Sequence, residues 1–189
     1  MNGASAQIHE PFAHDWRVEI LPVRPLILPQ RHFTYPRAVE EVERGALELM
    51  IDPGEGMPPF LATCALGFAD PIAPSGVWSA PNPKEICAVS GGYAYLIDTA
   101  RPERFAIIPY RPVLEVRAVE GLPLLLFVGH RSIIAWGQDG RAWESRKLSD
   151  EGLTVSAIEG ETLRGLGWQM MIDKEMPFAL DLKTGLRLE

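Results

Sequence analysis

The stretch that decides the fold is Ile133-Ile134-Ala135-Trp136-Gly137-Gln138-Asp139-Gly140-Arg141-Ala142-Trp143-Glu144-Ser145. It places Asp139-Gly140 between two runs of strand-forming residues, which is a strong signal for a β-hairpin. A two-residue turn at Asp139-Gly140 requires positive φ at both residues and places Trp136 opposite Trp143. The stretch therefore predicts a β scaffold, and we expect the two tryptophans to belong to its core.

Short apolar runs on both sides of this hairpin predict further strands. Residues 93–98 alternate between two sets of side chains, as in a half-buried strand, whereas residues 122–128 are continuously apolar, as in a strand covered on both faces. Similar runs occupy residues 60–67, 86–89, 104–108, 113–119, 153–158, 162–172, 178–182 and 186–188. Four meandering strands of this kind resemble a β-propeller blade. We expect a mainly β fold of antiparallel meander sheets, in a partial propeller-like or a sandwich arrangement.

One segment, residues 36–51, predicts an amphipathic α-helix. Pro36 suits its first turn, and Asp52-Pro53-Gly54 suits its end. The apolar residues expected on its buried face are Val39, Val42, Ala46, Leu49 and Met50.

Proline divides the chain into two predicted parts. Residues 1–36 carry five prolines, and residues 21–29 suit an extended or edge strand, because proline donates no hydrogen bond to a sheet. We expect residues 1–36 to form a proline-rich arm that packs along one β-rich domain, residues 37–189, which contains the helix.

Composition limits the classes of partner and the compartment. The formal net charge of −7 over 189 residues opposes binding to a phosphate backbone. Residues 1–16 show no signal-peptide pattern, and residues 122–128, the most apolar run, are too short to span a bilayer. We therefore expect a cytoplasmic protein without a nucleic-acid or membrane partner. Cys64 and Cys87 stand in apolar contexts, which predicts buried free thiols.

A long loop, residues 68–83, supplies most of the candidate binding residues. It combines several prolines with one aromatic residue, Trp78, and with the polar residues Asp70, Ser75 and Asn82. Rigid loops that carry polar and aromatic groups suit recognition. The alternative is a structural segment in which Trp78 fills the core.

Signals for catalysis are weak. His130 and Ser132 stand two apart after the apolar run, which suggests a nucleophile–base pair, but no Gly-x-Ser-x-Gly elbow frames Ser132. A polar turn between two strands is the simpler explanation of both residues. We therefore predict no catalytic residue and keep His130 as a candidate binding residue.

Metal and cofactor signals are weak as well. His9 and His14 are five residues apart with Pro11 between them, whereas two histidines that share one helix face are four apart. Gly91-Gly92 lacks the Lys-Ser/Thr of a phosphate-binding loop. We predict no metal site and no cofactor.

Two functions follow from these observations. The first is a non-catalytic β-rich interaction module that binds a protein partner, or itself, through loops and sheet edges. The second is a small hydrolase or small-molecule-binding protein whose pocket lies between residues 68–83 and the end of the 122–128 run. In that pocket His130 would act with a carboxylate such as Asp70.

Overall fold

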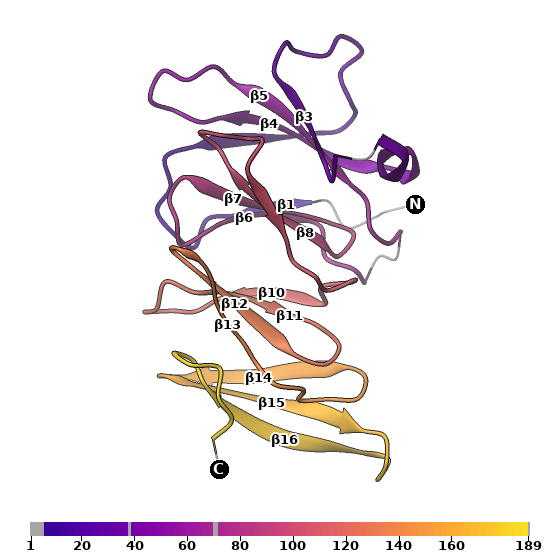
Figure 1. The fold of residues 1–189 in the computed structure, drawn as a ribbon, viewed down its shortest axis with the longest axis vertical. Helices are drawn as coiled ribbons and strands as arrows, with labels where there is room; N and C mark the ends of the chain where they lie inside the picture. Colours follow the sequence, from indigo (N-terminus) through magenta and orange to yellow (C-terminus); the bar gives the residue numbers. More distant parts are fainter. Residues whose placement is uncertain (1–5, 38, 70–71, 189) are drawn as a thin grey trace. The chain divides into compact units, whose positions relative to one another are not determined.

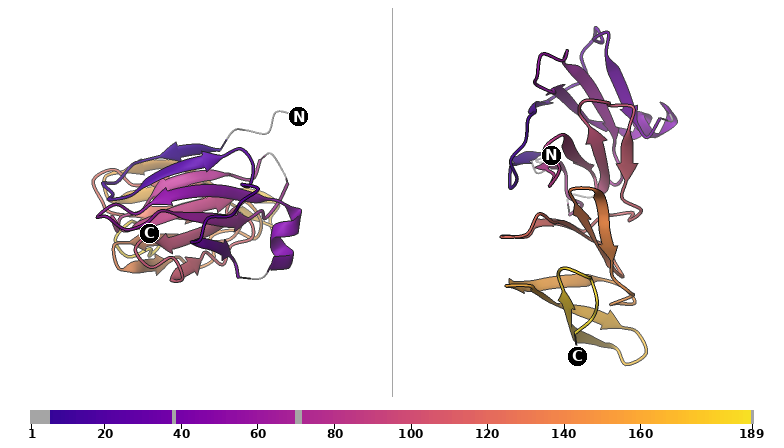
Figure 2. Two further views of the ribbon diagram at one scale, coloured as in Figure 1. Left: turned by 90° about the horizontal axis from the view of Figure 1, so that it is seen from above. Right: turned by 60° about the vertical axis from the view of Figure 1, so that its left-hand side comes forward.

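The computed structural model of the chain describes residues 6–37, 39–69 and 72–188. Within those residues it contains sixteen strands in four sheets and one short 3-10 helix, so the fold is mainly β, as predicted. The chain divides into two compact units, Met1–Pro112 and Val113–Glu189, and each unit holds two of the sheets. Within each unit the two sheets form two layers (Figure 1; Figure 2, right). The predicted division at residue 36 into an arm and one domain stays a prediction.

The first unit combines antiparallel meanders with two parallel strand pairs. One sheet has the order β2 (Arg17–Leu21), β4 (Ala46–Asp52), β5 (Phe60–Ala65), β3 (His32–Tyr35). The other has the order β1 (Gln7–His9), β6 (Gly76–Ser79), β7 (Glu85–Ser90), β8 (Tyr93–Asp98), β9 (Phe105–Ile107). The pairs β3–β5 and β1–β6 are parallel, and the rest are antiparallel. Residues 1–36, the predicted arm, thus contribute β1, β2 and β3 to these sheets.

One apolar core lies between the two sheets of this unit. It is formed by buried side chains from both sheets, among them Leu49, Ile51, Phe60, Ile86 and Ile97. Buried polar atoms at its edge are satisfied by backbone carbonyls: the indole N–H of Trp16 donates to Glu85 at 3.0 Å, and the Tyr35 hydroxyl donates to Pro102 at 2.7 Å. These two buried side chains therefore keep their hydrogen-bond partners, whereas the buried hydroxyl of Ser90 on β7 has none among the described residues.

The prediction of an α-helix over residues 36–51 is wrong. The structure has a 3-10 helix, η1 (Val39–Arg44), and then the strand β4. Gly45, between them, has a φ of 121°, which no helix tolerates. Leu47, Leu49 and Ile51 alternate along β4 and are all buried, so a period of two residues competes with the helical spacing and is the one that is realised.

The second unit consists of two antiparallel meanders of sequential strands. The first contains β10 (Glu115–Ala118), β11 (Leu125–Val128), β12 (Ile133–Gly137) and β13 (Gly140–Glu144). The second contains β14 (Leu153–Glu159), β15 (Thr162–Gln169) and β16 (Lys174–Asp181). After β16 the chain turns back, and a bridge pairs Arg187 with Leu180. Side chains from both sheets form one core, among them Leu126, Ile133, Leu153, Leu163 and Phe178.

The hairpin of β12 and β13 is confirmed, but its predicted register is wrong. The turn lies at Gln138 and Asp139, and Gly137 pairs with Gly140. A β-bulge next to Trp136 then shifts the pairing once more: Trp136 pairs with Arg141, and the next pair is Ala135 with Trp143, so β13 carries one extra residue. Trp143 therefore lies opposite Ala135 instead of Trp136. Trp143 is buried in the core, where its indole N–H donates to the carbonyl of Leu182 at 2.8 Å.

Candidate functional site

The predicted recognition loop, residues 68–83, is interrupted by the strand β6. Ser75 and Asn82 hold neighbouring backbone: the Ser75 hydroxyl accepts a hydrogen bond from Gly91 N at 2.8 Å, and the Asn82 side-chain carbonyl accepts one from Lys84 N at 3.0 Å. Asp70 lies outside the described residues. Ser75 and Asn82 thus hold neighbouring backbone. Binding through these two residues, and a pocket that joins residues 68–83 to His130, stay predictions.

Trp78 is half-buried on β6 and makes an aromatic contact within its own unit. Its ring stacks on that of His9, with a distance of 4.6 Å between ring centroids and an angle of 17° between planes. His14, the second N-terminal histidine, stacks in the same way on Trp16 at 4.0 Å. Both histidines therefore pack against tryptophans, and binding through Trp78 stays a prediction.

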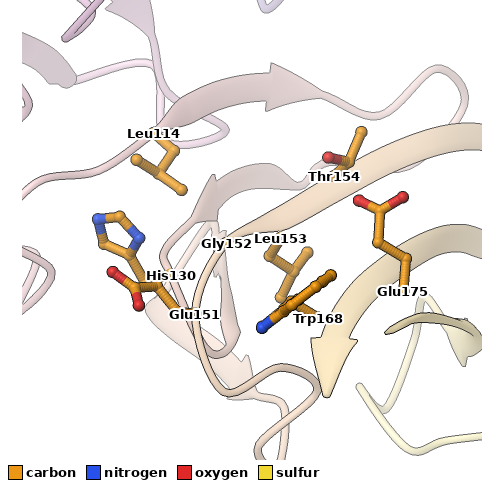
Figure 3. Close-up of a pocket in the computed structure, with 8 residues that line it drawn as sticks. All are labelled: Leu114, His130, Glu151, Gly152, Leu153, Thr154, Trp168 and Glu175. Carbon is orange, nitrogen blue, oxygen red and sulfur yellow. The ribbon is translucent and has the colours of Figure 1, made fainter. Parts of the chain in front are cut away.

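His130 lines a hollow of about 420 Å³ in the second unit (Figure 3). It lies in the turn between β11 and β12, and the other lining residues come from the segment before β10 and from around β14, β15 and β16. They are Leu114, Glu151, Gly152, Leu153, Thr154, Trp168 and Glu175. The hollow is thus built mainly on the second sheet of this unit, at the end where β14 begins.

The register of the second sheet places an indole beside a carboxylate. Trp168 and Glu175 lie directly opposite each other on β15 and β16, so their side chains share one face. Figure 3 shows Trp168 between Glu175, on the side of Thr154, and Glu151, on the side of His130. Carboxylates around an aromatic face attract a cation, through charge and through the ring quadrupole. This arrangement suits a ligand with a positively charged group.

The turn next to this hollow is fixed by Asp150. Its carboxylate accepts a hydrogen bond from Met170 N at 2.8 Å and pairs with Lys147, and these two bonds lower the pKa of Asp150. Arg131 also donates to the Asp150 carbonyl, at 3.0 Å. Ser132, the residue considered as a nucleophile, is not among the described residues that line the hollow.

An exposed apolar segment lies elsewhere, between β2 and β3. We call residues 22–31 the apolar loop. Leu26 is fully exposed there, Ile27 and Val23 are 88% and 73% exposed, and Leu28 is 44% exposed. Large apolar side chains gathered at a surface mark interaction sites. The sequence prediction treated this stretch as part of an arm. Pro22, Pro25 and Pro29 interleaved with apolar residues were the available signal, since prolines hold such side chains out of a regular sheet.

Two arginines attach the apolar loop to the sheet beneath it. The guanidinium of Arg24 lies 3.9 Å from a carboxylate oxygen of Glu48, whose side chain is only 7% exposed. The guanidinium of Arg31 donates to the carbonyl of Pro58 and lies over the ring of Phe60, 5.6 Å from its centroid. Charge thus holds both ends of a loop whose middle is apolar.

A buried polar network lies under the loop. Thr63 donates its hydroxyl proton to Glu48 at 2.6 Å, and Nε2 of His32 lies 2.9 Å from the same hydroxyl oxygen. The same Nε2 also lies 3.4 Å from the guanidinium of Arg24, which can only donate a hydrogen bond. Burial and then the charge of Arg24 lower the pKa of His32, while Glu48 acts in the opposite direction.

Within the described ranges, no group of three or more His, Cys, Asp or Glu side chains is placed to hold a metal ion. A search of the helical segments among the described residues finds none with the length and apolar character needed to cross a membrane. Comparison of the chain with protein-family models, with curated proteins and with solved structures finds no match.

Proposed function

We propose that this protein is a non-catalytic interaction module that binds another protein through the apolar loop. The observation that carries the proposal is the exposure of Leu26 and Ile27 in a segment that is held at both ends. Burying one such side chain in a partner contributes about 1.5–3 kcal/mol. A cytoplasmic location, and the absence of nucleic-acid and membrane partners, remain part of this proposal.

The loop is suited to binding because its shape is restricted before contact. Pro22, Pro25 and Pro29 fix three φ angles, and Arg24 and Arg31 fix the ends. A restricted segment loses less conformational entropy on binding than a flexible one. Among the described residues, the loop joins the two edge strands of its sheet, β2 and β3.

Charge indicates the kind of partner. The basic residues of the loop are Arg24 and Arg31, so an acidic rim around an apolar groove would complement it. Screening restricts charge effects to about 8–10 Å, so the two arginines act locally, with Arg24 already 3.9 Å from the Glu48 carboxylate. We therefore propose a different protein as the partner.

The test uses the double variant Leu26→Ser/Ile27→Ser and a control, Met171→Ser, which removes an equally exposed apolar side chain from the second unit. Each purified protein is used to capture partners from a lysate of its own source. We expect one protein to be retained by the wild type and the control, and its purified form to bind the double variant at least about tenfold more weakly.

Three outcomes would overturn the proposal. The first is equal retention of the same protein by the double variant. The second is retention of no protein by the wild type. The third is a second copy of this chain as the captured species, with light scattering showing a dimer that the double variant loses.

The position of Trp168 favours a second function, binding of a small organic cation in the His130 hollow. Glu151 and Glu175 make no ion pair with other described residues, so they are free to pair with an ammonium group. NMR of the indole N–H signals during titration with butylammonium tests this function. We expect one signal to shift, and Glu175→Gln, but not the control Glu159→Gln, to weaken binding. Equal binding by both variants would exclude it.

A further inference from the structure

A second hollow in the Val113–Glu189 unit has the opposite charge. It has a volume of about 420 Å³ and is lined by Arg146, Lys147, Leu148, Leu180, Gly185, Leu186 and Arg187. None of these described residues is acidic, although the chain carries 25 acidic against 18 basic side chains. We propose that this hollow, which we call the basic hollow, binds a small amphipathic anion: one carboxylate or phosphate group on an aliphatic body.

The floor of the basic hollow is apolar and rigid. Leu148 and Leu180 are 4% and 0% exposed and belong to the core shared by the two sheets of the unit. Leu186 is 60% exposed and adds an apolar wall that solvent reaches. Ligand pockets commonly have volumes of about 300–1,000 Å³ and are lined mainly by apolar side chains with a few polar groups. A short aliphatic chain in the hollow would thus contact Leu148 and Leu180 on one side and Leu186 on another.

The walls are fixed by backbone hydrogen bonds. The segment with Arg146 and Lys147 is held on one side by Ser145 N, which donates to Ile133 at 2.9 Å, and on the other by Leu148 N, which donates to Arg131 at 2.7 Å. The opposite wall is the returning chain after β16. Its turn is closed by the Asp181 carboxylate, which accepts hydrogen bonds from Lys183 N at 3.0 Å and Thr184 N at 2.8 Å.

The three basic side chains of the hollow differ in how many hydrogen bonds and ion pairs they already form within the protein. Lys147 pairs with Asp150, and one nitrogen of Arg187 donates to the Pro177 carbonyl at 3.2 Å, which leaves its other donors available. The guanidinium of Arg146 forms no hydrogen bond or ion pair with any residue that the structure describes. Arginine binds carboxylate and phosphate through two parallel N–H donors. Arg146 and Arg187 are therefore the residues expected to hold the anionic group.

Calorimetry with four probes tests the proposal: octanoate, octyl phosphate, octanol and inorganic phosphate. We expect octanoate, octyl phosphate or both to bind, and octanol and inorganic phosphate to bind at least about tenfold more weakly. Tighter binding of octanoate would indicate a fatty carboxylate as the ligand, and tighter binding of octyl phosphate would indicate an alkyl phosphate. The double variant Arg146→Gln/Arg187→Gln should weaken the better probe about tenfold or more. The matched control Arg164→Gln, an exposed arginine of β15 paired with Glu159, should leave it unchanged.

Circular dichroism of each variant confirms folding, which is expected because Arg146 and Arg187 are exposed. Raising the salt concentration should weaken binding of both anions, since exposed charges are screened. The proposal is overturned if neither anion binds at millimolar concentration, or if the double variant binds as the wild type does. Equal binding of inorganic phosphate and octyl phosphate would also overturn it, because the apolar floor would then contribute nothing.

Discussion

The hydroxyl oxygen of Thr63 lies 2.6 Å from a carboxylate oxygen of Glu48, and both side chains are buried. The two residues are direct partners on β5 and β4, so the sheet register itself brings the donor to the acceptor. Arg24, at the start of the apolar loop, approaches the same carboxylate from outside at 3.9 Å. The polar network thus connects the interior of the sheet to the proposed binding surface.

Replacing Thr63 by Val should lower the free energy of unfolding by about 1–3 kcal/mol, because it leaves the buried Glu48 carboxylate without its closest donor. Thr63→Ser keeps the hydroxyl and serves as the control. Urea denaturation of the two variants measures the difference. Thr63→Ser loses a buried methyl group, so a Thr63→Val variant that is more stable than Thr63→Ser would contradict this prediction.

Stability should fall as the pH decreases below about 6.5, in part because of His32. Burial and the Arg24 charge lower the pKa of His32 in the folded protein, so below its unfolded value of about 6.5 the unfolded chain binds more protons than the folded one. Protonation therefore favours unfolding, and the loss is complete once the pH is below the folded pKa. We expect His32→Gln to show a smaller decrease in unfolding free energy between pH 7.5 and 5.5. An identical pH profile for variant and wild type would contradict this assignment.

The thiols of Cys64 and Cys87 should be almost unreactive in the folded protein. Both are free and fully buried, and burial raises the pKa of each thiol; Glu48 adds to this effect for Cys64. The thiolate is the reactive form, so both access and ionisation are suppressed. A thiol reagent at pH 8 should react with both residues in guanidinium chloride and with neither in buffer. Fast reaction of one thiol in buffer would contradict the burial.

Gly185→Ala should destabilise the second unit by roughly 2 kcal/mol or more. Gly185 has a φ of 69°, and an added Cβ would lie 2.5 Å from a ring carbon of Trp143. Gly160→Ala is the matched control, because Gly160 also has positive φ, 57°, but has nothing within 4 Å of its Cβ position. The control should lose only the cost of the left-handed backbone, about 1 kcal/mol. Equal losses in chemical denaturation would show that the contact with Trp143 does not limit this position.

The strands of the second half of the chain were largely predictable, because their apolar runs are short and separated by turn residues. Residues 93–98 form β8, as their alternation predicts, and the end of the 122–128 run forms the fully buried β11. The predicted buried thiols are confirmed too. The sequence pattern predicted the right element wherever the spacing of the apolar residues fitted a strand and did not also fit a helix.

The failures have physical causes that local sequence does not carry. In residues 36–51 the apolar residues fit a helical spacing and an alternating one, and pairing with β2 and β5 selects the strand. The bulge at Trp136 depends on the sheet around it, and so does the position of Trp143. The two hollows and the anchoring of Arg24 combine residues from several strands, and sequence alone gives no distances between them.

Site-specific photo-crosslinking tests the central claim most directly. Benzoylphenylalanine is placed at position 26, in the apolar loop, or at position 171 as the control, and the protein is irradiated in cells of its source. Our account predicts one product that joins the chain to a single different protein from position 26, and its absence from position 171. Absence of a product at position 26, identical products at both positions, or a product of two copies of this chain would contradict it.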